Sequence, residues 1–251
     1  MIELDISAVS RVGCVRANNE DMILVGDFFV RDDEFRTSVE LKDKDRYMMA
    51  VADGMGGHNS GDVASSLSLH NLQFFFHDIP SNLNAGEFNE SIIGWLDSIN
   101  HVIDSKGTVD MSMKGMGTTL VALVYYNGDF YSLNCGDSRL YRFRKGELCQ
   151  LTTDHSLDNM LGEAKHSSVI TNCIGGGCKT SFFDIVKLTE DIQRGDVYLL
   201  CSDGLTDMLS DHRIGVLLEN GADANMLCEA GIERGGLDNV SACRIDVKLM
   251  I

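Results

Sequence analysis

The spacing of apolar positions predicts a chain built from both strands and helices. Several apolar runs have the length of a strand and end in turn residues. Asn127-Gly128 separates two of these runs and favours a tight hairpin, because both residues accept the positive φ angles of a type I′ turn. The predicted strands are YMMAVAD (47–53), TLVALVYY (119–126), DFYSLNC (129–135), a hairpin in RLYRFRKGELCQL (139–151), VYLLCSDG (197–204) and NVSACRIDVKL (239–249).

Helical spacing is clearest between the first strands and the central hairpin. Leu69, Leu72 and Phe76 fall on one helical face. A second stripe at intervals of three and four residues predicts a helix lying on a core, and it consists of Phe88, Ile92, Trp95, Ile99 and Val102. Two shorter helices are expected within 211–234. Residues 31–46 are mostly charged and are interpreted as an exposed hairpin tip or loop.

The order of strands, helix pair, strands and helices is typical of an α+β fold. Because consecutive hairpins join neighbouring strands, the sheets are expected to be mainly antiparallel. Pro80 is the only proline, and no Pro/Ser-rich linker interrupts the chain. We therefore expect one domain over residues 1–251.

Charge and composition narrow the possible partners. The chain has 38 acidic residues against 21 Lys and Arg, a formal net charge of −17, which repels nucleic-acid backbones and anionic lipid. We expect no nucleic-acid partner and no membrane partner. The acidic N-terminus lacks a signal-peptide pattern, which favours a cytoplasmic protein. Eight cysteines are too few for a disulfide scaffold; Cys173 and Cys178 are near neighbours, and most of the thiols are expected to be small buried hydrophobes.

Acidic residues recur where the predicted strands end. Asp53 and Asp203 each terminate an apolar run and precede a glycine. Further acids at comparable places are Asp137 in LNCGDSR, Asp238 in GGLDNVS and Asp21 in RANNED. Each one alone is typical of an ordinary turn.

Together these acids predict a cation site. Packed sheets bring their strand ends together, and two carboxylates about 4 Å apart repel by roughly 4 kcal/mol at an effective dielectric of 20. No His or Cys pair has metal-ligand spacing, so the ligands would be oxygen atoms, which suit Mg²⁺ or Mn²⁺ better than Zn²⁺. Gly54, without a side chain, would let its carbonyl turn toward the metal.

Seven motifs occur in an order that resembles one known family. The chain is similar to the metal-dependent protein phosphatase 2C family, particularly its bacterial branch, from about Ser7 to Val247. The motifs are SRVGCVRANNED, VADGMGGHNSGDVAS, GMGTTL, LNCGDSRLY, TTDHSL, LLCSDGLTD and GGLDNVS.

The resemblance implies a four-layer α/β/β/α sandwich, with two antiparallel sheets flanked by helix pairs, and two Mg²⁺ or Mn²⁺ ions at one end. By motif, Asp53 would bridge both ions and the Gly54 carbonyl would bind one of them. Asp203 and Asp238 would bind the other ion. The remaining implied roles are Asp21 in the ligand sphere or just behind it, Asp137 with Asp203 at a third, weaker site, and Arg16 on the substrate phosphate.

The implied activity is a serine/threonine protein phosphatase in which a hydroxide bridging the metals attacks phosphorus in line. Arg16, Asp53 and Asp203 would carry the catalysis. The partners would be phosphorylated proteins and a Ser/Thr kinase or its targets, with the phosphatase a monomer. Two alternatives stay open: a catalytically inactive, phosphatase-shaped binding module, and a hydrolase of small phosphate esters. The complete acid set argues against the first, and only a substrate panel decides the second.

The chain departs from the family pattern in two places. Met55 stands where eukaryotic members have histidine in DGHGG, so the acid that protonates the leaving group is open between a metal-bound water and His58. The segment 154–174 is a shortened version of a flap that helps choose the substrate. His155 and His166 within it are expected to have loop or cap roles.

Four further side chains carry weaker expectations. Arg139 would touch substrate or form an ion pair within the site. Asn239 would orient the Asp238 carboxylate. Asp62 and Asp207 are expected in the first turns of helices, where the helix dipole favours negative charge.

Overall fold

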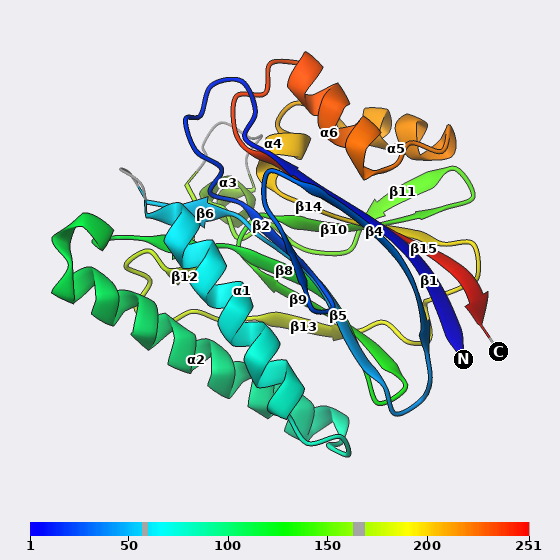
Figure 1. The fold of residues 1–251 in the computed structure, drawn as a ribbon, viewed down its shortest axis with the longest axis horizontal. Coiled ribbons are helices and arrows are strands. Elements are labelled where there is room, and N and C mark those ends of the chain that lie inside the picture. Colours follow the sequence, from blue (N-terminus) through cyan, green and yellow to red (C-terminus); the bar gives the residue numbers. More distant parts are fainter. Residues whose placement is uncertain (57–59, 163–168, 251) are drawn as a thin grey trace.

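Two six-stranded antiparallel sheets lie face to face, and helices cover their outer faces (Figure 1). The computed structural model describes residues 1–56, 60–162 and 169–250. One sheet has the order β11 (Glu147–Gln150), β10 (Arg139–Arg144), β14 (Val197–Cys201), β15 (Val240–Met250), β1 (Ile2–Arg11) and β4 (Glu34–Leu41). The other has the order β13 (Asp184–Lys187), β9 (Asp129–Cys135), β8 (Leu120–Tyr126), β5 (Arg46–Ala52), β2 (Met22–Val25) and β3 (Phe28–Val30).

The helices form two groups on opposite sides of the sheet pair (Figure 1). The long helices α1 (Gly61–Asp78) and α2 (Ala85–Val109) lie on the β8 sheet, and a short 3₁₀ turn (Met111–Met113) follows them. The shorter helices α4 (Asp203–Thr206), α5 (Asp211–Glu219) and α6 (Ala224–Glu233) lie on the β1 sheet. A small sheet of β12 (Ile174–Gly175), β7 (Gly117–Thr118) and β6 (Gly54–Met55) and the short helix α3 (Leu157–Leu161) complete the described elements.

Three apolar layers hold these elements together, one between the sheets and one under each helix group. Strand β8 shows why its run is apolar throughout. Leu120 and Ala122 face α1 and α2, whereas Val121 and Leu123 face the other sheet. Because both faces are buried, no polar position alternates with the apolar ones. The α/β/β/α sandwich implied by the resemblance is confirmed.

Most predicted elements are present. The β8–β9 hairpin turns at Asn127 (φ +52°) and Gly128 (φ +89°), as predicted. The α2 stripe is buried from Phe88 to Ile99, but the prediction for Val102 was wrong: its side chain is 43% exposed, and Ile103 is buried instead. At 3.6 residues per turn, the buried face advances to the next position at this end of the helix.

The interpretation of residues 31–46 as an exposed tip or loop was wrong for its central part. Glu34–Leu41 forms β4, which pairs antiparallel with β1 at the edge of its sheet. Phe35 and Val39 pack toward the core between the sheets, while the alternate positions Glu34, Arg36, Ser38 and Glu40 face solvent. An edge strand bonds to one neighbour only, so its outer side tolerates charges that hide the strand pattern.

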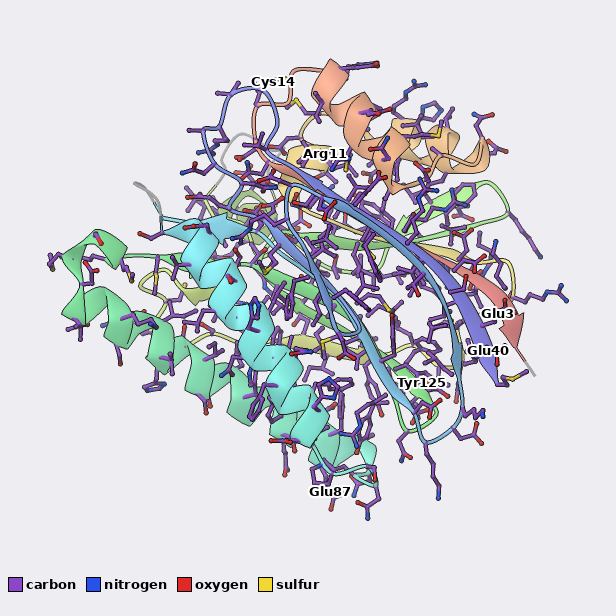
Figure 2. The ribbon with its side chains drawn as sticks, viewed as in Figure 1. Glu3, Arg11, Cys14, Glu40, Glu87 and Tyr125 are labelled. Carbon is purple, nitrogen blue, oxygen red and sulfur yellow. The ribbon has the colours of Figure 1, made fainter. Side chains whose placement is uncertain are left out.

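The site-bearing loops all leave the sheets at one end of the sandwich, while both chain termini lie at the other end (Figure 1). Figure 2 shows the two ends through labelled side chains: Glu3 on β1 and Glu40 on β4 lie near the termini, whereas Cys14 lies in the loop that follows β1, beside α6. The predicted acids follow β5, β9 and β14 or precede β2 and β15, and all of these junctions lie at the loop end.

Candidate active site

A cleft of about 680 Å³ opens at this end, and most of the predicted site residues line it. Asp53, Asp203 and Asp238 line it together with Arg16. Asp21 lies beneath the cleft with none of its surface exposed. Asp137 lies close enough to Asp53 for its charge to raise the pKa of that carboxyl. Acids separated by up to 217 positions are therefore brought together at the ends of the strands.

Thr118, at the end of β7, and Thr119, which follows it, hold the backbone of Asp53 in place. The Asp53 N–H donates to Thr119 Oγ1 (3.1 Å), and the Asp53 carbonyl accepts from the Thr119 N–H (2.9 Å) and from Thr118 Oγ1 (2.8 Å). Thr119 Oγ1 also shares a hydrogen bond with Ser138, the residue after Asp137. Both threonines are buried. They thus support two of the acidic turns, a role that their β-branched, strand-like character did not reveal.

The glycines that follow the strand-end acids allow backbone segments to pack closely. A Cβ at Gly54 would lie 2.2 Å from the carbonyl oxygen of Gly61. At Gly204 it would lie 1.9 Å from the carbonyl oxygen of Asn239. No side chain fits at either place, so a close backbone approach requires glycine. The turn after β5 rests on the start of α1, and the turn after β14 rests on the start of β15.

Burial and mutual repulsion raise the pKa values of the central acids. Burial is the main cause at Asp53, whose pKa lies well above its usual range, and Asp21, Asp203, Asp137 and a carboxyl-carboxyl hydrogen bond with Asp203 add to it. Burial also raises the pKa of Asp21 to about 7. Neither Asp21 carboxylate oxygen has a well-formed hydrogen bond, although the nearby Ser241 and Ser202 hydroxyls partly offset the rise.

This donor set suits a hard divalent cation. Buried carboxylate oxygens without hydrogen-bond donors lack compensation for their desolvation, and a bound cation would supply it. Within the part of the chain that the structure describes, no three His, Cys, Asp or Glu side chains are already grouped to hold a metal ion. The Asp238 carboxylate bonds Arg16 (2.6 Å). The acids therefore fit a hard cation by their chemistry, and Asp21 fits it by its burial as well.

Arg16 lies at the rim of the cleft with 54% of its side chain exposed. Its hydrogen bond with Asp238 is the main reason that its pKa is raised further. A planar guanidinium that is always charged and partly exposed can bind two oxygens of a phosphate.

Asn239 anchors the loop that carries Arg16. Its Oδ1 accepts from the Glu20 N–H (2.8 Å), and its Nδ2 donates to the carbonyls of Val12 (2.9 Å) and Asn18 (3.0 Å). The prediction that the Asn239 side chain orients the Asp238 carboxylate was wrong. Only the backbone N–H of Asn239 bonds that carboxylate (2.8 Å). The buried amide instead ties the β1–β2 loop to the start of β15.

Comparison with known proteins identifies the family. Residues 29–225 match the protein phosphatase 2C family. The chain belongs to the protein phosphatase 2C family. It is 32% identical to the serine/threonine protein phosphatase PstP of Mycobacterium tuberculosis, over 97% of this chain and 45% of PstP. It is 30% identical to protein phosphatase PhpP of Streptococcus pneumoniae, over 97% of this chain and 98% of PhpP. The chain thus spans about half the length of PstP and nearly all of PhpP.

Solved structures of phosphatase 2C relatives share this fold. A serine/threonine phosphatase of S. agalactiae superposes with a TM-score of 0.82 at 27% identity, covering 98% of this chain and all of that one. The PstP catalytic domain in complex with two manganese ions superposes with a TM-score of 0.76 at 30% identity, covering 99% of this chain and all of that one. In the described residues of this phosphatase 2C chain, no helix has both the length and the apolar surface needed to span a bilayer.

Two acids that line the cleft were not among the predicted site residues. Glu20 lines the cleft, and burial raises its pKa. Its position beside Asp21 in RANNED was the available signal. Asp207 also lines the cleft, and the expectation that it starts a helix was wrong, because it forms the C-cap of α4. Asp62 lies in the first turn of α1, as expected.

Arg139 forms an ion pair, the second of its two expected roles. Its guanidinium bonds both carboxylate oxygens of Asp154 (Nη2 to Oδ2, 2.6 Å) and donates to the Tyr141 hydroxyl (2.7 Å). Only 15% of its side chain is exposed.

His155 joins three segments around the Asp137 turn. Its Nδ1 accepts from the Gly136 N–H (3.1 Å) and lies 2.8 Å from the Asn172 amide. Because Nδ1 accepts, the ring proton is on Nε2, which donates to Asp184 Oδ2 (3.0 Å). The expected loop role of His155 is therefore specific: it holds the base of the segment 154–174 against the Asp137 turn. His58 and His166 lie outside the described residues.

Proposed function

We propose that this chain is a divalent-metal-dependent phosphatase that hydrolyses phosphoserine and phosphothreonine in proteins. The observation that carries the proposal is the group of acids at an open cleft, with the fully buried Asp21 beneath it and Arg16 at its rim. The names of the relatives PstP and PhpP support the substrate class. Phosphorylated proteins are then its substrates, and a Ser/Thr kinase or the targets of that kinase are its partners, in the cytoplasm.

The proposed ligands are those of the family pattern. Asp53, the Gly54 carbonyl, Asp203 and Asp238 would hold two Mg²⁺ or Mn²⁺ ions, with Asp53 shared between them. Asp21 lies in the ligand sphere or just behind it. The buried Asp21 oxygens support this assignment, because they have no well-formed hydrogen bond. Asp137 would share a third, weaker ion with Asp203.

When bound, two divalent ions supply a nucleophile at neutral pH by lowering the pKa of a water molecule. The chain itself then has to hold the phosphate and align it. The Arg16 guanidinium bonds the Asp238 carboxylate (2.6 Å) and is about half exposed at the rim of the cleft. Its remaining N–H groups would bind two oxygens of the substrate phosphate. We therefore propose that Asp238 positions Arg16 for the phosphate.

The leaving serine or threonine oxygen needs a proton as its bond to phosphorus breaks. Met55 lines the cleft but carries no proton that it could donate. We propose that a water held at the metal site would donate this proton, because the cleft is open to solvent and Met55 has no proton to give.

Hydrolysis of p-nitrophenyl phosphate and of a phosphothreonine peptide, each with Mn²⁺, Mg²⁺ or EDTA, tests the proposal. We expect activity toward both substrates only with a divalent metal, and its loss in Asp53→Asn. Asp27→Asn is the matched control, because Asp27 is exposed and pairs with His77 on α1 outside the cleft. Activity that persists in EDTA would exclude the mechanism. Manganese binding without hydrolysis would instead support the inactive binding module, and hydrolysis of the small ester alone would support the small-ester hydrolase.

A further inference from the structure

Two thiols lie in contact in the wall of the cleft. Cys173 and Cys178 both line it, their sulfur atoms are 3.1 Å apart, and neither is in a disulfide. We propose that Cys173 and Cys178 form a dithiol that a peroxide oxidises to a disulfide, and that this disulfide slows turnover in the adjacent cleft. The formation of the disulfide is independent of the proposed function; its effect on turnover rests on that function.

A glycine turn brings the two thiols together. Gly175, Gly176 and Gly177 have φ values of +73°, +64° and +82°, a left-handed run that other residues rarely adopt. The Cys178 N–H donates to the Gly175 carbonyl (3.0 Å) and closes the turn. The chain therefore reverses between the two cysteines, and their side chains meet although five positions separate them.

The turn is held from outside by a buried side chain of α2. Asn100 accepts from the Gly175 N–H (2.6 Å) and donates to the Cys178 carbonyl (3.2 Å). The Gly176 N–H also donates to the Met116 carbonyl (2.7 Å). These bonds couple the turn to α2 and to the segment before β7, so the two sulfurs stay within reach of each other and a pull on the turn is passed on to its neighbours.

The two thiols differ in access, which sets the order of the reaction. Cys173 is 3% exposed, and burial raises the pKa of its thiol, whereas Cys178 is partly exposed. The Cys178 thiolate attacks the peroxide, its S–O bond forms as the O–O bond breaks, and hydroxide or alkoxide leaves. The Cys173 sulfur then attacks the sulfenic sulfur. The S–S bond forms, and the sulfenic oxygen takes up the protons and leaves as water.

Closure of the disulfide moves the cleft wall. A disulfide has an S–S length of about 2.05 Å, so the sulfurs must approach by about 1 Å. Strand β12, which begins one residue after Cys173, pairs with β7, and β7 pairs with β6 and bonds the Asp53 carbonyl through Thr118. The shift therefore acts two strands from the proposed metal ligands. Because a 1 Å displacement can reduce turnover by up to about 100-fold, we expect kcat/KM to fall at least about fivefold.

The test oxidises the reduced 251-residue chain with hydrogen peroxide in EDTA, removes the peroxide and restores Mn²⁺. Peptide mass spectrometry should show the loss of two hydrogen atoms from the peptides that contain Cys173 and Cys178, and dithiothreitol should restore both mass and kcat/KM. Cys178→Ser and Cys173→Ser should each keep activity after peroxide treatment. Cys14→Ser is the control, because Cys14 is an exposed thiol in the loop after β1 (Figure 2) and its removal should leave the inhibition intact.

Two results would overturn the inference: Cys173 and Cys178 still reduced at a peroxide concentration that oxidises Cys14, or a disulfide that leaves kcat/KM unchanged. If the reduced chain is inactive, the proposed function fails, but the mass measurement still decides the disulfide. Manganese affinity measured by calorimetry then replaces turnover as the readout of the cleft, with weaker binding expected in the oxidised chain and equal binding contradicting the effect on the wall.

Discussion

Asp21→Asn should stabilise the metal-free protein while weakening its response to metal. Asp21 is fully buried, and its carboxylate lacks well-formed hydrogen bonds. Burial, with the charges of Asp203 and Asp238, raises its pKa from 3.8 to about 7. A carboxyl whose pKa is raised by folding lowers the free energy of unfolding at every pH above its unfolded pKa, because the unfolded chain loses that proton first. Asparagine has nearly the same shape and carries no charge.

The size of the effect follows from the pKa and depends on pH. An acid with a raised folded pKa binds more protons in the folded state between pH 4 and 7, so the free energy of unfolding falls as the pH rises through this window. At 1.36 kcal/mol per pH unit, the Asp21 carboxyl lowers the free energy of unfolding by about 4 kcal/mol at pH 8 and by about 2 kcal/mol at pH 5. Asp21→Asn should therefore raise metal-free stability by up to about 4 kcal/mol at pH 8 and by about half of that at pH 5.

Urea unfolding in EDTA at pH 5 and pH 8 measures both values. Asp97→Asn is the matched control, because Asp97 is exposed on α2 and its change should alter neither value appreciably. In saturating Mn²⁺ the order should reverse, since the wild type gains binding free energy that the variant lacks. The reasoning is refuted if Asp21→Asn is no more stable than the wild type at pH 8 in EDTA, or if its gain is equally large at pH 5.

Three further tests, each with its own variants, address other parts of the protein. Arg16→Ala should raise KM for a phosphothreonine peptide at least about tenfold and keep the Mn²⁺-induced shift in Tm, because the guanidinium acts on phosphate; unchanged kinetics would remove it from the site. Gly204→Ala should reduce the free energy of unfolding by more than about 2 kcal/mol, since its Cβ would lie 1.9 Å from a carbonyl oxygen. Gly94→Ala, in α2 with no atom within 4 Å of the new Cβ, should be neutral or stabilising by up to about 1 kcal/mol; equal losses in urea unfolding would contradict the steric argument. The asparagine of His155→Asn can replace Nδ1 and accept from the Gly136 N–H, whereas the glutamine of His155→Gln reaches the place of Nε2 instead. His155→Asn should therefore keep more activity and a higher Mn²⁺ affinity than His155→Gln. Equal losses of kcat and of Mn²⁺ affinity by calorimetry would show that the bond to Gly136 does not support the site.

The chain pattern determined the elements whose signals are local. The β8–β9 hairpin follows from two apolar runs and the positive-φ pair Asn127-Gly128, and these depend on neighbouring residues only. The α2 helix follows from its apolar stripe for the same reason. Strand β4 escaped prediction because its order comes from pairing with β1, a partner more than twenty positions away, while its outer face is charged.

In the candidate site, too, the sequence predicts the residues with local signals but not the contacts between distant residues. The sequence marks Asp53 and Asp203 as acids where buried strands end, and the family resemblance adds their order along the chain. It does not show that Asp238 bonds Arg16 or that Asn239 holds the β1–β2 loop, because these bonds join residues more than 200 positions apart.

Local chemistry, then, determined the strands, the long helices and the acids of this protein, because turn preference and apolar periodicity act between near neighbours. Only the tertiary structure decided which side chain each acid faces, which glycines admit a crossing backbone, and that Asn100 holds two thiols in contact beside the cleft. Those outcomes depend on the packing of the two sheets and their helices, which sets distances that no short stretch of sequence contains.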